Sequence, residues 1–209
     1  MRKLSLLTLL ITTTMFNVFG QGKDKSEKEF NKNKAKIFPV VKVETSGGSG
    51  KTIEFTAENQ PVFKKIAGDL LCFYGIEKSD NFVLLTKSQI PSTISMDDLD
   101  NIAKENLLSE VQKNLKIHKT DFGGLGFTCG GNHEATLILL PEIWGVLIEK
   151  LGENIVFGVP AKDMSIFVNA DQIDSLNKLQ EMINDIHKDG SRLLSKKMFR
   201  YKDGQIEVN

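Results

Sequence analysis

Three short stretches of this sequence combine residue types that carry out chemistry in other proteins. The stretch "GGSGKT", residues 47–52, ends like the loop that binds nucleotide phosphates. His133 and Glu134 stand side by side, as they do in zinc hydrolases. Cys129 precedes His133 by four residues, and a cysteine with a histidine is one form of activated nucleophile. Spacing and the surrounding elements decide whether any of these interpretations holds.

The phosphate-loop interpretation fails on spacing and on context. The motif needs a glycine five residues before Gly50, and that position is Thr45. It also needs Lys51 to open a helix, because the amides at a helix N-terminus hold the phosphate. Here Lys51 opens the alternating stretch "KTIEF", which is typical of a strand. We therefore predict a glycine-serine hairpin loop and no nucleotide.

The other two stretches have equally plain structural explanations. Zinc hydrolases carry a second histidine four residues after the first, and here that position is Leu137. Cys129 and His133 are close only in sequence, whereas catalytic pairs meet in space. Glu134 and Asp163 could work together as acids only if the fold brings them within about 10 Å of each other. We predict no metal site and no cofactor.

The chain has two cysteines, Cys72 and Cys129. In an exported protein such a pair permits one disulfide. The alternative is two separate buried thiols that act as small apolar residues. Both cysteines lie in apolar, strand-like stretches, and the sequence leaves the two possibilities open.

Composition is that of a globular protein, with 40% hydrophobic and 26% charged residues among 209. The 27 basic residues balance the 27 acidic ones. Nucleic-acid binding normally requires a basic surplus, so we expect no nucleic-acid partner. The length allows a single domain with a sizeable core.

The N-terminus indicates export. Arg2 and Lys3 precede an uncharged, mostly apolar run, and the layout of residues 1–20 is that of a signal peptide cleaved between Gly20 and Gln21. An uncleaved anchor is the alternative, but the run is near the lower limit of a bilayer span. We expect a periplasmic or extracellular protein without a stable membrane anchor. Residues 21–36 are Lys-rich and predict a flexible tether.

Residues 37–209 predict one α+β domain with a mixed, largely antiparallel sheet and about three helices. The helices are expected after the N-caps Ser95 and Asp171, and from Pro141 to a stop at Gly152. Strands and a closing hairpin are expected in the remaining apolar stretches: residues 37–44, 51–57, 69–76, 81–87, 115–120, 133–140, 154–160, 164–170 and 198–208.

The second half resembles the YtpQ-like family of bacterial proteins, a family of unknown function. The resemblance lies in motifs that recur in order: Ala103, Asn106 and Leu107; "EATLILLP" at 134–141; Val159, Pro160 and Asp163; and Phe199, Arg200, Asp203 and Gly204. It covers roughly residues 37–208. No catalytic residue or cofactor follows from it. Many members lack a signal peptide, so this chain departs from them at its N-terminus.

We expect a non-catalytic binding domain whose partner is an unknown protein or small molecule. An envelope hydrolase and an immunity or effector-associated protein are the alternatives. Candidate pocket residues share a polar side chain within or beside the motifs above: Asn106, His133, Glu134, Asp163 and Arg200. Structural roles are expected for Asn106, as a donor to the backbone of a neighbouring strand, and for Asp163, as a loop cap.

Overall fold

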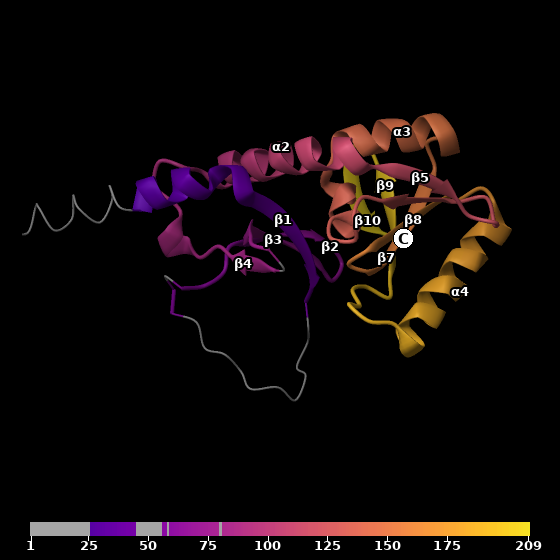
Figure 1. Cartoon of the computed structure of the whole chain (residues 1–209). Coiled ribbons are helices and arrows are strands. Elements are labelled where there is room, and N and C mark those ends of the chain that lie inside the picture. The colour runs from indigo at the N-terminus through magenta and orange to yellow at the C-terminus, as the bar shows by residue number, and fades with distance from the viewer. Residues whose placement is uncertain (1–25, 45–55, 58, 80) are drawn as a thin grey trace, which may run out of the picture.

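The computed structural model describes residues 26–44, 56–57, 59–79 and 81–209 (Figure 1). The predicted signal peptide with its Gly20–Gln21 cleavage site and the glycine-serine loop around Lys51 lie outside the described residues. Within them the fold is α+β, as predicted from the sequence, with helices packed on two antiparallel sheets.

The first sheet has four antiparallel strands. They are β1 (Ile37–Val43), β2 (Phe63–Ala67), β3 (Leu70–Glu77) and β4 (Phe82–Leu84). Strand β3 pairs with β1 on one side and with β2 and β4 on the other, so β1 is an edge strand. The strands expected over residues 37–44 and 69–76 are present as β1 and β3. Pro39 lies on the edge strand β1, where its missing N–H is tolerated.

Helix α2 (Met96–Asn114) covers one face of the first sheet. It begins as predicted, because the Ser95 side chain accepts from the Asp98 N–H and the Asp98 carboxylate accepts from the Ser95 N–H. Tyr74 of β3 donates to Asp100 Oδ1 at 2.9 Å, and Lys104 lies 2.9 Å from Oδ2 of the same carboxylate. This network attaches the first turns of α2 to the sheet.

The second sheet has six antiparallel strands in the order β10-β9-β7-β8-β6-β5. Their bounds are β5 (Lys116–Lys119), β6 (Leu125–Thr128), β7 (Ile155–Ala161), β8 (Met164–Asn169), β9 (Met198–Lys202) and β10 (Gln205–Val208). The last two form the predicted hairpin. Its turn residues Asp203 and Gly204 both have positive φ, at 50° and 78°, as a two-residue hairpin turn requires.

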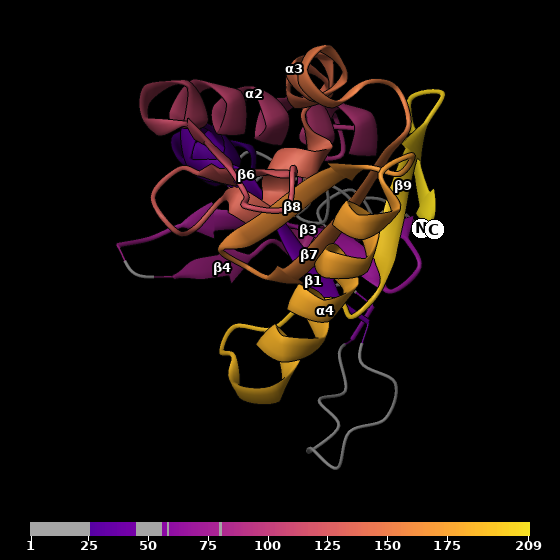
Figure 2. The same cartoon turned by 90° about the vertical axis from the view of Figure 1, so that its right-hand side faces the viewer.

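Helices cover both faces of the second sheet (Figures 1 and 2). On one face, α3 (Pro141–Leu151) packs Trp144 against Phe157 and Phe167. On the other, α4 (Ile173–Asp189) packs so closely that a Cβ at Gly158 would lie 2.6 Å from Ile183. Pro141 and Gly152 bound α3 as predicted.

The described residues also form three short 3-10 helices: η1 (Lys34–Lys36), η2 (Lys87–Gln89) and η3 (Glu134–Leu139). The strand expected over residues 133–140 is wrong, because this stretch is η3. All six of its residues are buried between the two sheets. An apolar run buried on every side has no alternation, so periodicity cannot separate a strand from a buried helical segment.

Two further expectations differ from the structure. Residues 26–33 of the expected tether are helical, and Phe30 docks into the core with 4% of its surface exposed. The N-cap of α4 is Gln172 rather than Asp171, and no side chain caps it. Asp171 instead accepts a hydrogen bond from Asn154 Nδ2 at 2.7 Å.

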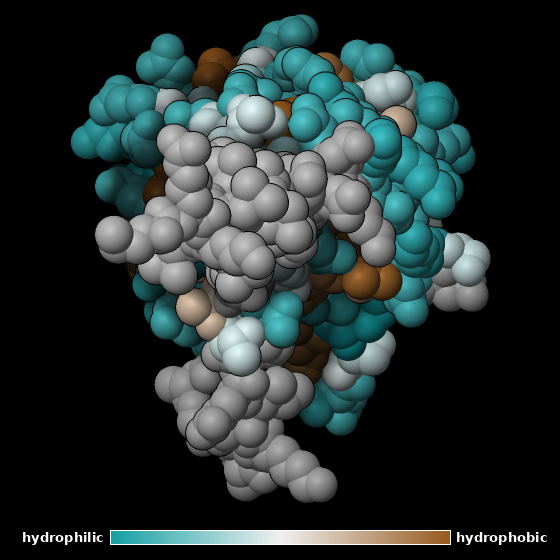
Figure 3. All heavy atoms as spheres, turned by 90° about the vertical axis from the view of Figure 1, so that its left-hand side faces the viewer, coloured by the Kyte–Doolittle hydropathy of each residue, from teal (hydrophilic) through white to brown (hydrophobic). Residues whose placement is uncertain are grey.

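Most of the surface that Figure 3 colours by hydropathy is hydrophilic, with hydrophobic atoms in small separate areas. One main core cluster of buried side chains joins both sheets, α2 and α3, and a smaller one lies under α4. Among the described residues, none of the helices combines the length and the apolar character that crossing a membrane requires.

Candidate functional site

A pocket of about 500 Å³ lies where the two sheets meet. We call it the inter-sheet pocket. It is lined on one side by β1 residues 39–42 and by the β3–β4 hairpin, and on the other by Asn132, Ala135, Thr136, Lys162 and Arg192. Val40, Phe82 and Leu84 give it an apolar wall. Its volume falls within the range of about 300–1,000 Å³ that is typical of ligand pockets.

Among the described residues that line the inter-sheet pocket, cationic side chains outnumber acidic ones. Lys42 and Lys78 come from the first sheet, and Lys162 and Arg192 from the turn after β7 and the segment after α4. Among the lining residues that the structure describes, Glu77 is the one acidic residue. The described residues therefore give the pocket a surplus of positive charge.

Lys42 and Lys162 lie close enough to repel each other. Burial lowers the pKa of Lys42, and the positive charge of Lys162 lowers it further. Among the described residues, no acidic side chain forms an ion pair with either lysine. Two half-buried cations without a counter-ion are unfavourable in the free protein, and an anion between them would relieve that cost.

Arg192 is held at the rim of the pocket by two partners. Its Nη2 donates to Asn132 Oδ1 at 3.3 Å, and its Nη1 lies 3.5 Å from the Asp163 carboxylate. The backbone at Arg192 has a φ of 58°, an unusual value for a residue with a side chain. The Lys162 N–H donates to the Arg192 carbonyl at 3.0 Å, which ties the two cationic segments together.

Glu134 is a structural residue. It is 1% exposed, and its carboxylate accepts from the N–H groups of Cys129, Gly131 and His133 at 2.8, 2.7 and 3.1 Å. The glycine-rich loop before it, which resembles an oxyanion loop in sequence, therefore directs its amides at the chain's own carboxylate. Both Glu134 oxygens accept backbone hydrogen bonds, and the side chain is buried, so its carboxylate faces the protein rather than the pocket.

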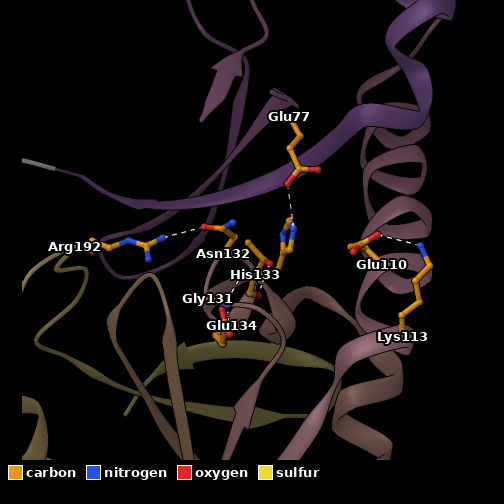
Figure 4. Close-up of polar contacts among 9 residues, drawn as sticks. Glu77, Glu110, Lys113, Gly131, Asn132, His133, Glu134 and Arg192 are labelled. Atoms are coloured by element: carbon orange, nitrogen blue, oxygen red, sulfur yellow. Dashed lines mark hydrogen bonds and ion pairs between the residues drawn. The ribbon is translucent and has the colours of Figure 1, made fainter. Parts of the chain in front are cut away.

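His133 joins the two halves of the molecule (Figure 4). Its ring contacts Phe38 in a tilted arrangement and Phe82 edge to face, with centroids 5.2 and 5.9 Å away. Nε2 points at Glu77, 3.7 Å from Oε1, and Nδ1 has no hydrogen-bond partner. Burial lowers the pKa of His133 despite the nearby carboxylates of Glu77, Glu110 and Glu134. The neutral ring is 4% exposed and does not line the pocket.

The remaining candidates from the sequence lie apart from one another. Asn106 donates through Nδ2 to the carbonyls of Lys34 and Ile37, both at 2.8 Å, which is the structural role expected for it. Arg200 of β9 donates to Asn209 Oδ1 at 2.9 Å and does not line the pocket. The Asp163 side chain is 43% exposed, and its one ion pair within the described part of the chain is with Arg192.

The geometry does not assemble the hydrolase considered from the sequence. His133 and Glu134 are buried with their acid–base atoms facing protein, and Asp163 lies on an exposed turn. Cys72 and Cys129 are free, buried thiols, so the alternative to a disulfide is the correct one. Burial raises the pKa of Cys129 to about 12, with the Glu134 charge as a second cause. In the described part of the chain, no three His, Cys, Asp or Glu side chains gather as metal ligands would.

Sequence reasoning missed the residues that make the pocket cationic. Lys42 stands in a strand and Lys162 in a turn 120 positions later, and neither belongs to a motif. The stretch "VPAKD" was a weak indication of Lys162, which lies beside Asp163 in one of the motifs of the family resemblance. Comparisons with models of protein families, with curated proteins and with solved structures found no match, so the YtpQ-like resemblance stays a prediction.

Proposed function

We propose that this chain is a non-catalytic binding protein whose inter-sheet pocket takes an anionic ligand. The observation that carries the proposal is the pairing of Lys42 with Lys162, half-buried and without a counter-ion among the described residues. A bound carboxylate or phosphate would accept hydrogen bonds from both ammonium groups, and charge-assisted bonds of this kind are strong. Arg192 and Lys78 add long-range attraction at the rim.

The apolar wall supports a ligand with both an anionic group and an apolar part. Val40, Phe82 and Leu84 line the same pocket as the lysines. Pockets of this kind combine apolar walls with a few polar groups that fix the orientation of the ligand. Asn132 and Thr136 are uncharged lining residues that could provide such groups.

Calorimetric titration with citrate and with inorganic phosphate tests the proposal. We expect binding by the unmodified protein that weakens as salt is added, because exposed charges are screened. Lys162→Met should reduce the affinity at least tenfold. Lys119→Met is the matched control, because Lys119 lies exposed on β5, outside the pocket lining, and should bind like the unmodified protein.

Equal affinity of the Lys162→Met and Lys119→Met proteins would refute the proposal. So would the absence of binding by either anion at low salt.

We also propose that the protein acts outside the cytoplasm. The basis is the basic and apolar character of residues 1–20. Mass spectrometry of the protein from its native host should give a chain that begins at Gln21. A chain that retains residues 1–20 and is recovered from the cytoplasm would contradict export.

A further inference from the structure

The inter-sheet pocket lies over one face of the first sheet. Residues two apart on a strand, and residues directly opposite on paired strands, have their side chains on the same face. By this rule the lining side chains of the first sheet share one face, in successive rows from one end to the other: Lys42; Val40; Leu84; and Phe82 with Glu77. The opposite face carries Tyr74, which donates to Asp100 of α2. The pocket therefore lies between the lined face and the second sheet.

Opposite charges stand at the two ends of the lined face. Lys42 pairs with Leu71 at one end of β3, and Glu77 lies six residues further along β3 at the other. At about 3.3 Å per residue, the two rows are about 20 Å apart. Lys162 of the β7–β8 turn lies at the Lys42 end, where its charge lowers the pKa of Lys42. The pocket thus has a cationic end and an acidic end.

Glu77 contributes a carboxylate at the acidic end. Its side chain is 36% exposed, and Oε1 lies 3.7 Å from Nε2 of His133, a neutral ring (Figure 4). Lys78 lines a second pocket on the opposite face, with Ile76 and Val83, as the alternation of side chains requires. Within the described part of the chain, neither a lysine nor an arginine forms an ion pair with Glu77. A cationic group of a ligand is therefore favourable at this end.

Between the two ends the lining is both apolar and polar. Val40 and Leu84 give the sheet side an apolar surface, and Asn132 and Thr136 add an amide and a hydroxyl from the other side. A hydrocarbon chain would leave such polar groups without partners, which costs free energy. A peptide offers apolar side chains to the sheet and amide groups to the other side, so it suits this lining better.

We propose that the inter-sheet pocket binds a short apolar peptide with both of its ends free. The C-terminal carboxylate lies between Lys42 and Lys162, and the protonated N-terminus meets Glu77. An extended chain rises about 3.3 Å per residue, so at most about six residues fit between the two ends of the pocket. Opposite charges at the two ends also fix the direction of the peptide. This rests on the proposed anion-binding function and names its ligand class.

Calorimetric titration with four forms of one pentapeptide, Val-Ala-Val-Ala-Val, tests the proposal. One form has both ends free, one is N-acetylated, one is C-amidated and one is blocked at both ends. Acetylation removes the ammonium charge, and amidation removes the carboxylate. Since charge-assisted hydrogen bonds are strong, each block should reduce the affinity about tenfold or more.

Two substitutions assign the ends of the peptide. In Glu77→Gln, acetylation should change the affinity less than about twofold, while amidation keeps its effect. In Lys162→Met the reverse should hold. Such non-additivity is expected of groups in direct contact. Lys119→Met, outside the lining, should keep both effects. Citrate should bind Glu77→Gln at least as tightly as the unmodified protein, because the variant lacks a carboxylate in a cationic pocket.

The remaining outcomes separate the two proposals. If citrate binds and the unblocked peptide does not, the peptide proposal is wrong and anion binding stands. If neither binds, both are wrong. Equal affinity of the free and acetylated peptides for the unmodified protein would refute the contact with Glu77. So would an undiminished effect of acetylation in Glu77→Gln.

Discussion

The Nε2 atom of His133 lies 3.7 Å from Oε1 of Glu77, so the start of η3 meets strand β3 across the boundary between the two sheets (Figure 4). A carboxylate at this distance normally favours a protonated imidazole. Burial outweighs it here and lowers the pKa of His133. The junction of the sheets therefore holds a neutral ring, packed against Phe38 and Phe82.

This ring should make stability fall with acidification. In the unfolded chain His133 takes up a proton near its ordinary pKa of 6.5, whereas the folded state resists protonation. The unfolded state then binds more protons, so the free energy of unfolding decreases as the pH drops below about 6.5, by at most about 1.4 kcal/mol per pH unit. Urea unfolding of His133→Gln between pH 7 and pH 5 should show a smaller slope. His118→Gln, at an exposed site on β5, should keep the original slope, and an unchanged slope in His133→Gln would contradict this account.

Loss of the Glu134 carboxylate should destabilise the fold strongly. Glu134→Ala leaves the N–H groups of Cys129, Gly131 and His133 without their acceptor, and each unsatisfied buried group costs about 1–3 kcal/mol. We expect the free energy of unfolding to fall by about 3 kcal/mol or more, measured in urea. Glu149→Ala, at an exposed position of α3, should change it by less than about 0.5 kcal/mol. Similar values for the two variants would show that Glu134 is not a structural acceptor.

Both thiols should be inert in the native state. Burial raises the pKa of Cys72 and of Cys129 to about 12, so little thiolate exists at pH 8. A disulfide-exchange reagent such as dithionitrobenzoate should react with neither cysteine in buffer. It should react with both in about 6 M guanidinium, which unfolds the protein. Rapid reaction in buffer would contradict the burial. An absence of thiols in denaturant would indicate a disulfide instead.

Local rules predicted much of the fold because their evidence lies within a few residues. Ser95 and Asp98 cap α2, Pro141 starts α3, and Asp203 with Gly204 turns the last hairpin, each as expected. Expectations failed where tertiary burial decided the outcome. The helix at 26–33 docks through the buried side chain of Phe30, and η3 lies between two sheets that no local pattern places there.

The candidate site was the least predictable part. His133, Glu134 and Asp163 attracted notice for their residue types, yet two are buried in structural contacts and the third pairs on an exposed turn. Lys42 and Lys162 carry the proposed function, but an isolated lysine in a strand or a turn has no motif. Only the meeting of the two sheets brings them together.

The central claim is that the chain keeps Lys42 at the cost of stability in order to bind an anion. The direct test measures the free energy of unfolding of Lys42→Met and of the unmodified protein, in sodium citrate and in sodium chloride of equal ionic strength. In chloride, removing a half-buried cation that has no counter-ion among the described residues should stabilise the protein by about 0.5 kcal/mol or more. In citrate the unmodified protein should gain stability through binding and the variant should not. A variant that is less stable in chloride, or that gains as much from citrate as the unmodified protein, would contradict the claim.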